Sequence, residues 1–144
     1  MYRVLVVDDY EPWRCHIRSA IQTSPHWRIV GEAVDGVDAI QKAQALDPDL
    51  ILLDIGLPRL DGIQAARQIL ATHPGSRILF VSEHQSPDIV DAAMATAAGG
   101  YLVKSEAGRE LFFAMDAVVS GSCFVSARLA RSIDAAASSQ LSLK

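Results

Sequence analysis

The chain has 144 residues, of which 50% are apolar and 21% are charged, an ordinary composition for a globular domain. Its formal net charge is −4, and no cluster of basic residues could follow a nucleic-acid backbone, so we do not expect this chain to read DNA. No apolar run approaches the roughly 20 residues of a membrane-spanning helix. Cys15 and Cys123 lie far apart, without the spacing of a zinc site, and we expect two reduced thiols in a cytoplasmic protein.

Short apolar runs alternate along the chain with segments of helical periodicity. The runs predict strands over 4–7, 28–34, 50–53, 78–81 and 101–103. Between and after them, apolar residues recur at helical spacing over 13–21, 39–46, 63–70, 89–97 and 111–118. Prolines or glycines mark most of the boundaries, for example Pro12 and Pro87 in first turns and Gly99 after the fourth helix.

Strict alternation of strands and helices predicts an α/β fold, a doubly wound five-stranded parallel sheet with helices on both faces. Because each crossover is right-handed, the carboxyl ends of all strands meet at one edge of the sheet. Ligands of such sheets bind at that edge, near the point where the strand order reverses.

A polar residue ends four of the five predicted strands at this same edge. Asp8 and Asp9 follow the first strand, and Asp54 follows the third. Ser82 ends the fourth strand and Lys104 follows the fifth. Any one of them could be an ordinary polar residue in a loop, but the whole set at one edge indicates a functional site.

Three carboxylates at one edge repel one another, by roughly 4 kcal/mol for two charges about 4 Å apart at an effective dielectric constant of 20. A hard divalent cation with oxygen ligands, most plausibly Mg²⁺, would relieve that repulsion. Lys104 adds a second cation and the hydroxyl of Ser82 adds a hydrogen-bond donor. Asp54, between the metal and these donors, is arranged as a nucleophile that accepts a phosphoryl group.

The stretches "VLVVDD", "LILLDIGLPRLDGI", "FVSEH" and "GGYLVKS" resemble the receiver domain of two-component response regulators, over about residues 2–120. The resemblance implies a flavodoxin-like fold with strand order 2-1-3-4-5. It also implies that Asp54 accepts the phosphoryl group from a sensor histidine kinase, and that Ser82 and Lys104 hold the phosphoryl oxygens. Implied metal ligands are Asp9, Asp54 and the backbone carbonyl of Gly56, with Asp8 acting mostly through water. Tyr101 would be the switch aromatic that moves with Ser82.

The stretches "DIGLP…DGI" and "AAGGYLVKSEAGRELFFAMDAVVSGSCFVS" resemble the NarL/LuxR subgroup, whose members usually carry a C-terminal helix-turn-helix domain. On this basis we divide the chain into a receiver, 1–121, and a linker helix and tail, 122–144, that lead toward an output domain. The resemblance implies transcriptional control through that absent domain, pairing of two copies when phosphorylated, and no membrane partner.

Other functions fit the sequence less well. An aspartyl phosphatase of the haloacid-dehalogenase type needs a second acid two residues after the nucleophile, where this chain has Gly56. We therefore expect no enzyme activity beyond the chain's own phosphorylation and dephosphorylation. A flavodoxin-like electron carrier would need a phosphate-binding loop after the first strand, where Asp8 and Asp9 would repel the flavin phosphate. A stand-alone receiver that acts through protein–protein contacts remains an alternative.

Overall fold

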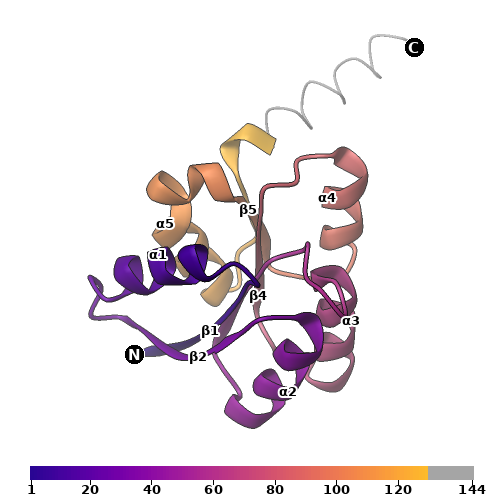
Figure 1. Cartoon of the computed structure of the whole chain (residues 1–144). Coiled ribbons are helices and arrows are strands. Elements are labelled where there is room, and N and C mark those ends of the chain that lie inside the picture. Colours follow the sequence, from indigo (N-terminus) through magenta and orange to yellow (C-terminus); the bar gives the residue numbers. More distant parts are fainter. Residues whose placement is uncertain (130–144) are drawn as a thin grey trace, which may run out of the picture.

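The computed structural model describes residues 1–129 as one parallel sheet between two layers of helices (Figure 1). The strand order is β2-β1-β3-β4-β5-β6, and each neighbouring pair is parallel. The strands are β1 (Tyr2–Val7), β2 (Trp27–Ala33), β3 (Leu50–Leu53), β4 (Ile78–Ser82), β5 (Gly100–Val103) and β6 (Phe124–Val125). The predicted order of the first five strands is confirmed. The predicted number of strands is wrong, because β6 extends the sheet by a sixth.

Five α-helices connect or follow the strands: α1 (Glu11–Ile21), α2 (Gly36–Leu46), α3 (Gly62–Thr72), α4 (Pro87–Met94) and α5 (Ala107–Val119), with a short 3₁₀ helix η1 at Lys104–Glu106. Local chemistry sets where they begin. Asp35 and Asp61 cap α2 and α3, since each carboxylate accepts a backbone N–H three residues further on. The helix predicted to reach residue 97 ends at Met94, and Ala97 has left-handed backbone geometry, with φ of 68°.

Alternate residues of each strand face opposite sides of the sheet and bury two apolar cores. Leu5, Leu53 and Phe80 belong to the core that α2, α3 and α4 cover. Val4 and Leu79 face the other way, toward the core under α1 and α5. Figure 1 shows these two helix layers on either side of the sheet. Burial on both faces explains why the strands read as continuous apolar runs rather than alternating ones.

The segment after α5 returns to the sheet and pairs with the outer edge of β5. The Phe124 N–H donates to the Gly99 carbonyl at 3.1 Å, and the Ser126 N–H donates to the Tyr101 carbonyl at 3.0 Å. The fully buried Ser126 hydroxyl then accepts the Val103 N–H at 2.9 Å. Without this segment the backbone groups of β5 would remain an unpaired edge. Of the segment predicted as a linker helix and tail, 122–144, Phe124–Val125 form β6 instead and residues 127–129 are helical. Residues 130–144 of that prediction lie outside the described residues.

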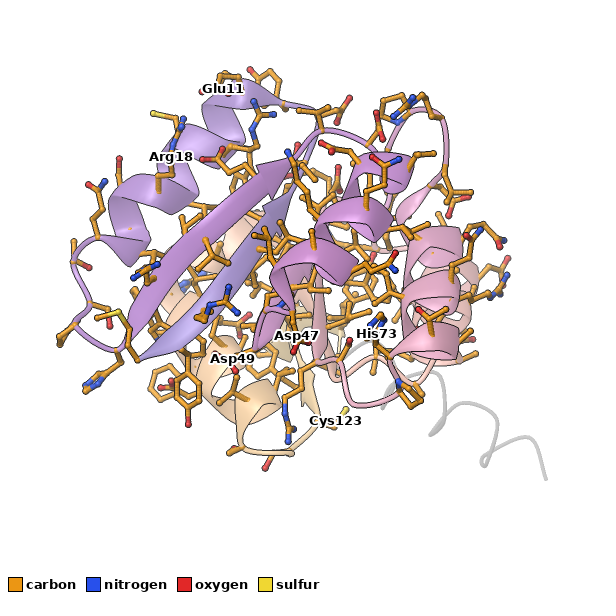
Figure 2. The ribbon with its side chains drawn as sticks, turned by 90° about the horizontal axis from the view of Figure 1, so that it is seen from below. Glu11, Arg18, Asp47, Asp49, His73 and Cys123 are labelled. Carbon is orange, nitrogen blue, oxygen red and sulfur yellow. The ribbon has the colours of Figure 1, made fainter. Side chains whose placement is uncertain are left out.

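The sheet edge where the strands begin carries a separate set of polar residues (Figure 2). Asp49 precedes β3 and accepts the Arg3 N–H at 2.7 Å, which ties the start of β1 to the start of β3. Trp27 begins β2 with 4% of its surface exposed, and its ring lies 5.0 Å from that of Tyr2.

Cys15 and Cys123 are both exposed free thiols. Within residues 1–129 the helices are too short or too polar to cross a bilayer.

Candidate functional site

The fold brings the three predicted carboxylates together at the edge where the strands end. One carboxylate oxygen from each of Asp8, Asp9 and Asp54 lies within 4.8 Å of the other two. Asp8 is 1% exposed and Asp54 is 8% exposed, whereas Asp9 is open to solvent. Two of the three acids are therefore held where water screens their charge poorly.

Lys104 supplies the cation nearest to the buried pair of carboxylates. Its Nζ lies 2.7 Å from Asp8 Oδ2 and 3.8 Å from Asp54 Oδ2. Only 11% of the Lys104 side chain is exposed. One ammonium thus faces two buried carboxylates, with Asp9 as a third acid beside them, and the cluster keeps a negative excess.

The negative excess of the cluster affects the pKa of Asp54. Burial is the main cause that raises the pKa of this carboxyl above its usual value, and the negative charge of Asp8 raises it further. Lys104 and the Ile55 N–H act in the opposite direction. A further cation beside Asp54 would therefore favour the ionised carboxylate, which is the nucleophilic form.

The oxygen atoms of this cluster fit a hard divalent metal. Asp8 Oδ1 accepts the Tyr10 N–H and Asp54 Oδ1 accepts the Ile55 N–H, each at 2.9 Å, so a hydrogen bond orients each carboxylate. Asp8 Oδ2 is buried without a hydrogen-bond donor, although Lys104 pairs with it electrostatically. Oxygen-only donors with waters completing the shell are what Mg²⁺ prefers.

Ser82 and Tyr101, predicted to act as donor and switch, are joined through the backbone of His84. Both predicted residues are fully buried. The His84 N–H donates to Ser82 Oγ at 3.1 Å, and the Tyr101 hydroxyl donates to the His84 carbonyl at 2.7 Å. Burial is the main cause that raises the pKa of the Tyr101 phenol. Tyr101 thus points inward, toward the loop that follows Ser82.

Sequence reasoning missed two residues of this region. His84 holds Ser82 and Tyr101 through its backbone, and its ring Nε2 would lie 3.6 Å from a Cβ placed on Gly56. The only signal in the sequence was its place two residues after Ser82. Trp13, which helical spacing places on the apolar face of the first helix, is half-buried against the core under α1 and α5. Lys104 Nζ also lies 5.1 Å from the centre of its ring.

The loop between β3 and α3 is anchored by an arginine in an uncommon conformation. Arg59 has a φ of 65°, in the left-handed region that non-glycine residues seldom adopt. Its guanidinium contacts both oxygens of Asp35, at 2.9 and 3.1 Å. The hydrogen bond from Arg59 is the largest cause that holds the pKa of Asp35 below its usual value, and the Asp38 N–H adds to it. The pair ties the loop after the phosphoacceptor candidate to the start of α2.

Replacing Arg59 by alanine should lower the stability of the protein at neutral pH, and this loss should shrink as the pH falls below the usual pKa of an aspartate, about 4. A carboxyl with a depressed pKa stabilises the fold above its unfolded-state pKa, and this contribution disappears as the pH falls through the folded-state pKa. Thermal unfolding of the wild type and R59A from pH 7 to pH 3 should show melting temperatures that converge over the acid range. R67A, which removes an exposed arginine from α3, is the control and should track the wild type. A pH-independent difference for R59A would mean that the ion pair is not its source.

Comparison with known proteins gives the same assignment as the fold and the acid cluster. The family model of the response regulator receiver domain matches residues 4–116, and the chain belongs to this family. The transcriptional regulatory protein YdfI of Bacillus subtilis is 33% identical over 121 residues, which are 84% of this chain and 56% of that protein. A protein-glutamate methylesterase/protein-glutamine glutaminase of Geobacter sulfurreducens is 52% identical over 80 residues, 56% of this chain and 22% of that protein.

Solved structures show which subgroup the chain resembles. A LuxR-family two-component response regulator from Aurantimonas sp. superposes with a TM-score of 0.87 and 31% identity, over 91% of this chain and 94% of that chain. Besides the methylesterase, the relatives thus include response regulators of the NarL/LuxR type, as the sequence motifs predicted. The chain spans about half the length of the regulators it matches, such as YdfI, of which it covers 56%.

Proposed function

We propose that this receiver is a phosphorylation switch in which Asp54 accepts a phosphoryl group from a histidine kinase or a small phosphodonor. A carboxylate oxygen of Asp54 would form a bond to phosphorus while the bond from phosphorus to the donor nitrogen or oxygen breaks. Asp54 must be ionised and Lys104 must be near. Lys104 lies close by, and a cation held by the acids would favour the ionised carboxylate against the effects of burial and of Asp8. The observation that carries the proposal is the buried Asp54 carboxylate, 3.8 Å from Lys104 Nζ and clustered with two more acids.

The other residues would each act on the transferred group or on the metal. Asp8, Asp9, Asp54 and the Gly56 carbonyl would hold Mg²⁺, which when bound would offset the negative charge of the incoming phosphoryl oxygens. Lys104 would shift from Asp8 toward those oxygens, and the Ser82 hydroxyl would donate to one of them. Because Ser82 and Tyr101 meet at the backbone of His84, movement of Ser82 would alter the position of Tyr101.

Incubation with acetyl phosphate should add one phosphoryl group to the wild type in the presence of Mg²⁺ and none after chelation. Intact-mass spectrometry measures the gain directly. D54N should remain unlabelled, because an amide is not a nucleophile toward phosphorus. D88N, which changes an exposed acid of α4, is the matched control and should be labelled like the wild type. Equal labelling of D54N would place the nucleophile elsewhere.

The relatives support a proposal for the output of the switch. The named relatives include a transcriptional regulatory protein, and the chain covers 56% of it, which leaves room for a further domain. We propose that the chain is the receiver part of a cytoplasmic transcription regulator, and that DNA binding belongs to a domain outside residues 1–144. In this proposal the chain catalyses only its own phosphorylation and dephosphorylation, and phosphorylated copies pair.

A further inference from the structure

We propose that Trp13 is a positioning residue for Lys104. The Trp13 ring holds the Lys104 ammonium between the carboxylates of Asp8 and Asp54 and leaves it free to move from one to the other. The inference rests on the proposed phosphorylation of Asp54. It adds a residue of α1 to the residues that sequence motifs place at the site.

The geometry places the ammonium between acid and ring. Lys104 Nζ lies 2.7 Å from Asp8 Oδ2 and 5.1 Å from the centre of the Trp13 ring. A cation within about 6 Å of an aromatic ring centre is attracted by the negative face of the ring, and tryptophan gives the strongest such attraction. With 11% of the Lys104 side chain exposed, little water competes for the ammonium.

The helical turn that carries the ring is held in place by hydrogen bonds. The backbone N–H of Trp13 donates to the Tyr10 carbonyl at 3.1 Å in the first turn of α1. Arg14 Nη1 donates to the Asp8 carbonyl at 2.8 Å, which ties that turn to the end of β1. The His16 ring lies 5.4 Å from the Trp13 ring. The turn that carries the ring therefore has a defined position relative to Asp8, and the His16 ring lies beside the Trp13 ring.

An aromatic face suits a lysine that must change partners. In the structure the ammonium is closer to Asp8 than to Asp54, by 2.7 against 3.8 Å, whereas a phosphoryl group on Asp54 would draw it the other way. A third carboxylate or a carbonyl in place of the ring would compete for the ammonium through a directed hydrogen bond. Attraction to a ring face is less directional, so the ammonium can move across it while water stays excluded.

Two substitutions separate this role from simple packing. Trp13→Phe keeps an aromatic face, and Trp13→Leu keeps an apolar side chain without one. We expect W13L to lose about two- to fivefold in the rate of labelling by saturating acetyl phosphate with Mg²⁺, and W13F to retain most of the wild-type rate. Thermal unfolding of both variants checks that they are folded. Equal rates for folded W13L and W13F would overturn the proposal.

The two tryptophans of the chain provide a second measurement. Trp27 lies at the opposite edge of the sheet, paired with Tyr2, so W27F leaves Trp13 as the only tryptophan. We expect the Trp13 emission of W27F to change when Mg²⁺ and acetyl phosphate are added, as the ammonium moves across the ring face from Asp8 toward the phosphoryl group. The emission of W13F, which reports Trp27, should stay constant. An unchanged W27F spectrum on a protein that intact mass shows to be phosphorylated would also overturn the proposal.

These outcomes are distinct from failure of the proposed function. If the wild type takes up no phosphoryl group, the proposed function fails. If the wild type is labelled on Asp54 but the rates of W13L and W13F coincide, only the role of Trp13 fails.

Discussion

Replacing Gly62 by alanine should destabilise the protein by about 3 kcal/mol or more, because the added methyl group has no space. A Cβ on Gly62 would lie 1.9 Å from the carbonyl oxygen of Asp54 and 2.8 Å from the Cα of Ile55. Both contacts are with backbone, which cannot rotate away as a side chain could. The Gly62 N–H also donates to the Ile55 carbonyl at 2.8 Å, so the first turn of α3 rests directly on the chain that carries Asp54.

Urea unfolding measures this loss, and intact-mass measurement with acetyl phosphate shows whether the proposed phosphorylation of Asp54 is affected as well. G108A is the matched control, since a Cβ on Gly108 of α5 would meet nothing within 4 Å. Removing a glycine from a helix should stabilise G108A by about 0.5–1 kcal/mol. If G62A were as stable as the wild type, the close approach of α3 to Asp54 would be wrong.

Replacing Lys104 by methionine should destabilise the protein by about 3 kcal/mol in the absence of Mg²⁺, because two buried carboxylates lose their cation. The pKa of Asp54, which burial and the charge of Asp8 already raise, would then rise further because Lys104 no longer lowers it. A carboxyl with a raised pKa destabilises the fold as the pH rises from its unfolded-state pKa through its folded-state pKa. The stability difference between the wild type and K104M should therefore be largest near pH 7 and shrink toward pH 4.

Urea unfolding at several pH values, with and without Mg²⁺, measures both effects. Mg²⁺ should restore part of the stability of K104M, since it brings positive charge back to the acids. K42M is the control, because Lys42 forms a partly exposed ion pair with Asp38 on α2, and such pairs contribute about 0–1 kcal/mol. A pH-independent loss in K104M would point to packing rather than charge.

The first five strands and the edge where the site lies could be predicted from the sequence alone. Buried parallel strands need continuous apolar residues, so each polar residue that ended a run, such as Asp8 or Asp54, marked the end of its strand. Right-handed crossovers then place all those ends together without knowledge of any contact. For the same reason the acids and Lys104 could be assigned to one cluster before any distance was known.

Contacts between distant segments were decided only by the tertiary structure. Phe124–Val125 is too short to read as a strand, and it becomes one because β5 offers an unpaired edge that Ser126 completes. Trp27 lies one residue before the predicted second strand, and it is buried because it begins β2 and packs on Tyr2.

Contacts between distant segments also decide the arrangement of side chains within the site. The sequence placed Trp13 on the first helix and Lys104 after the fifth strand, but 90 residues separate the two along the chain. Only the packing of α1 beside the carboxyl ends of β1 and β5 sets the ring against the ammonium. Strand ends follow from local patterns of hydrophobicity, whereas the partner of each side chain depends on how the helices pack around the sheet.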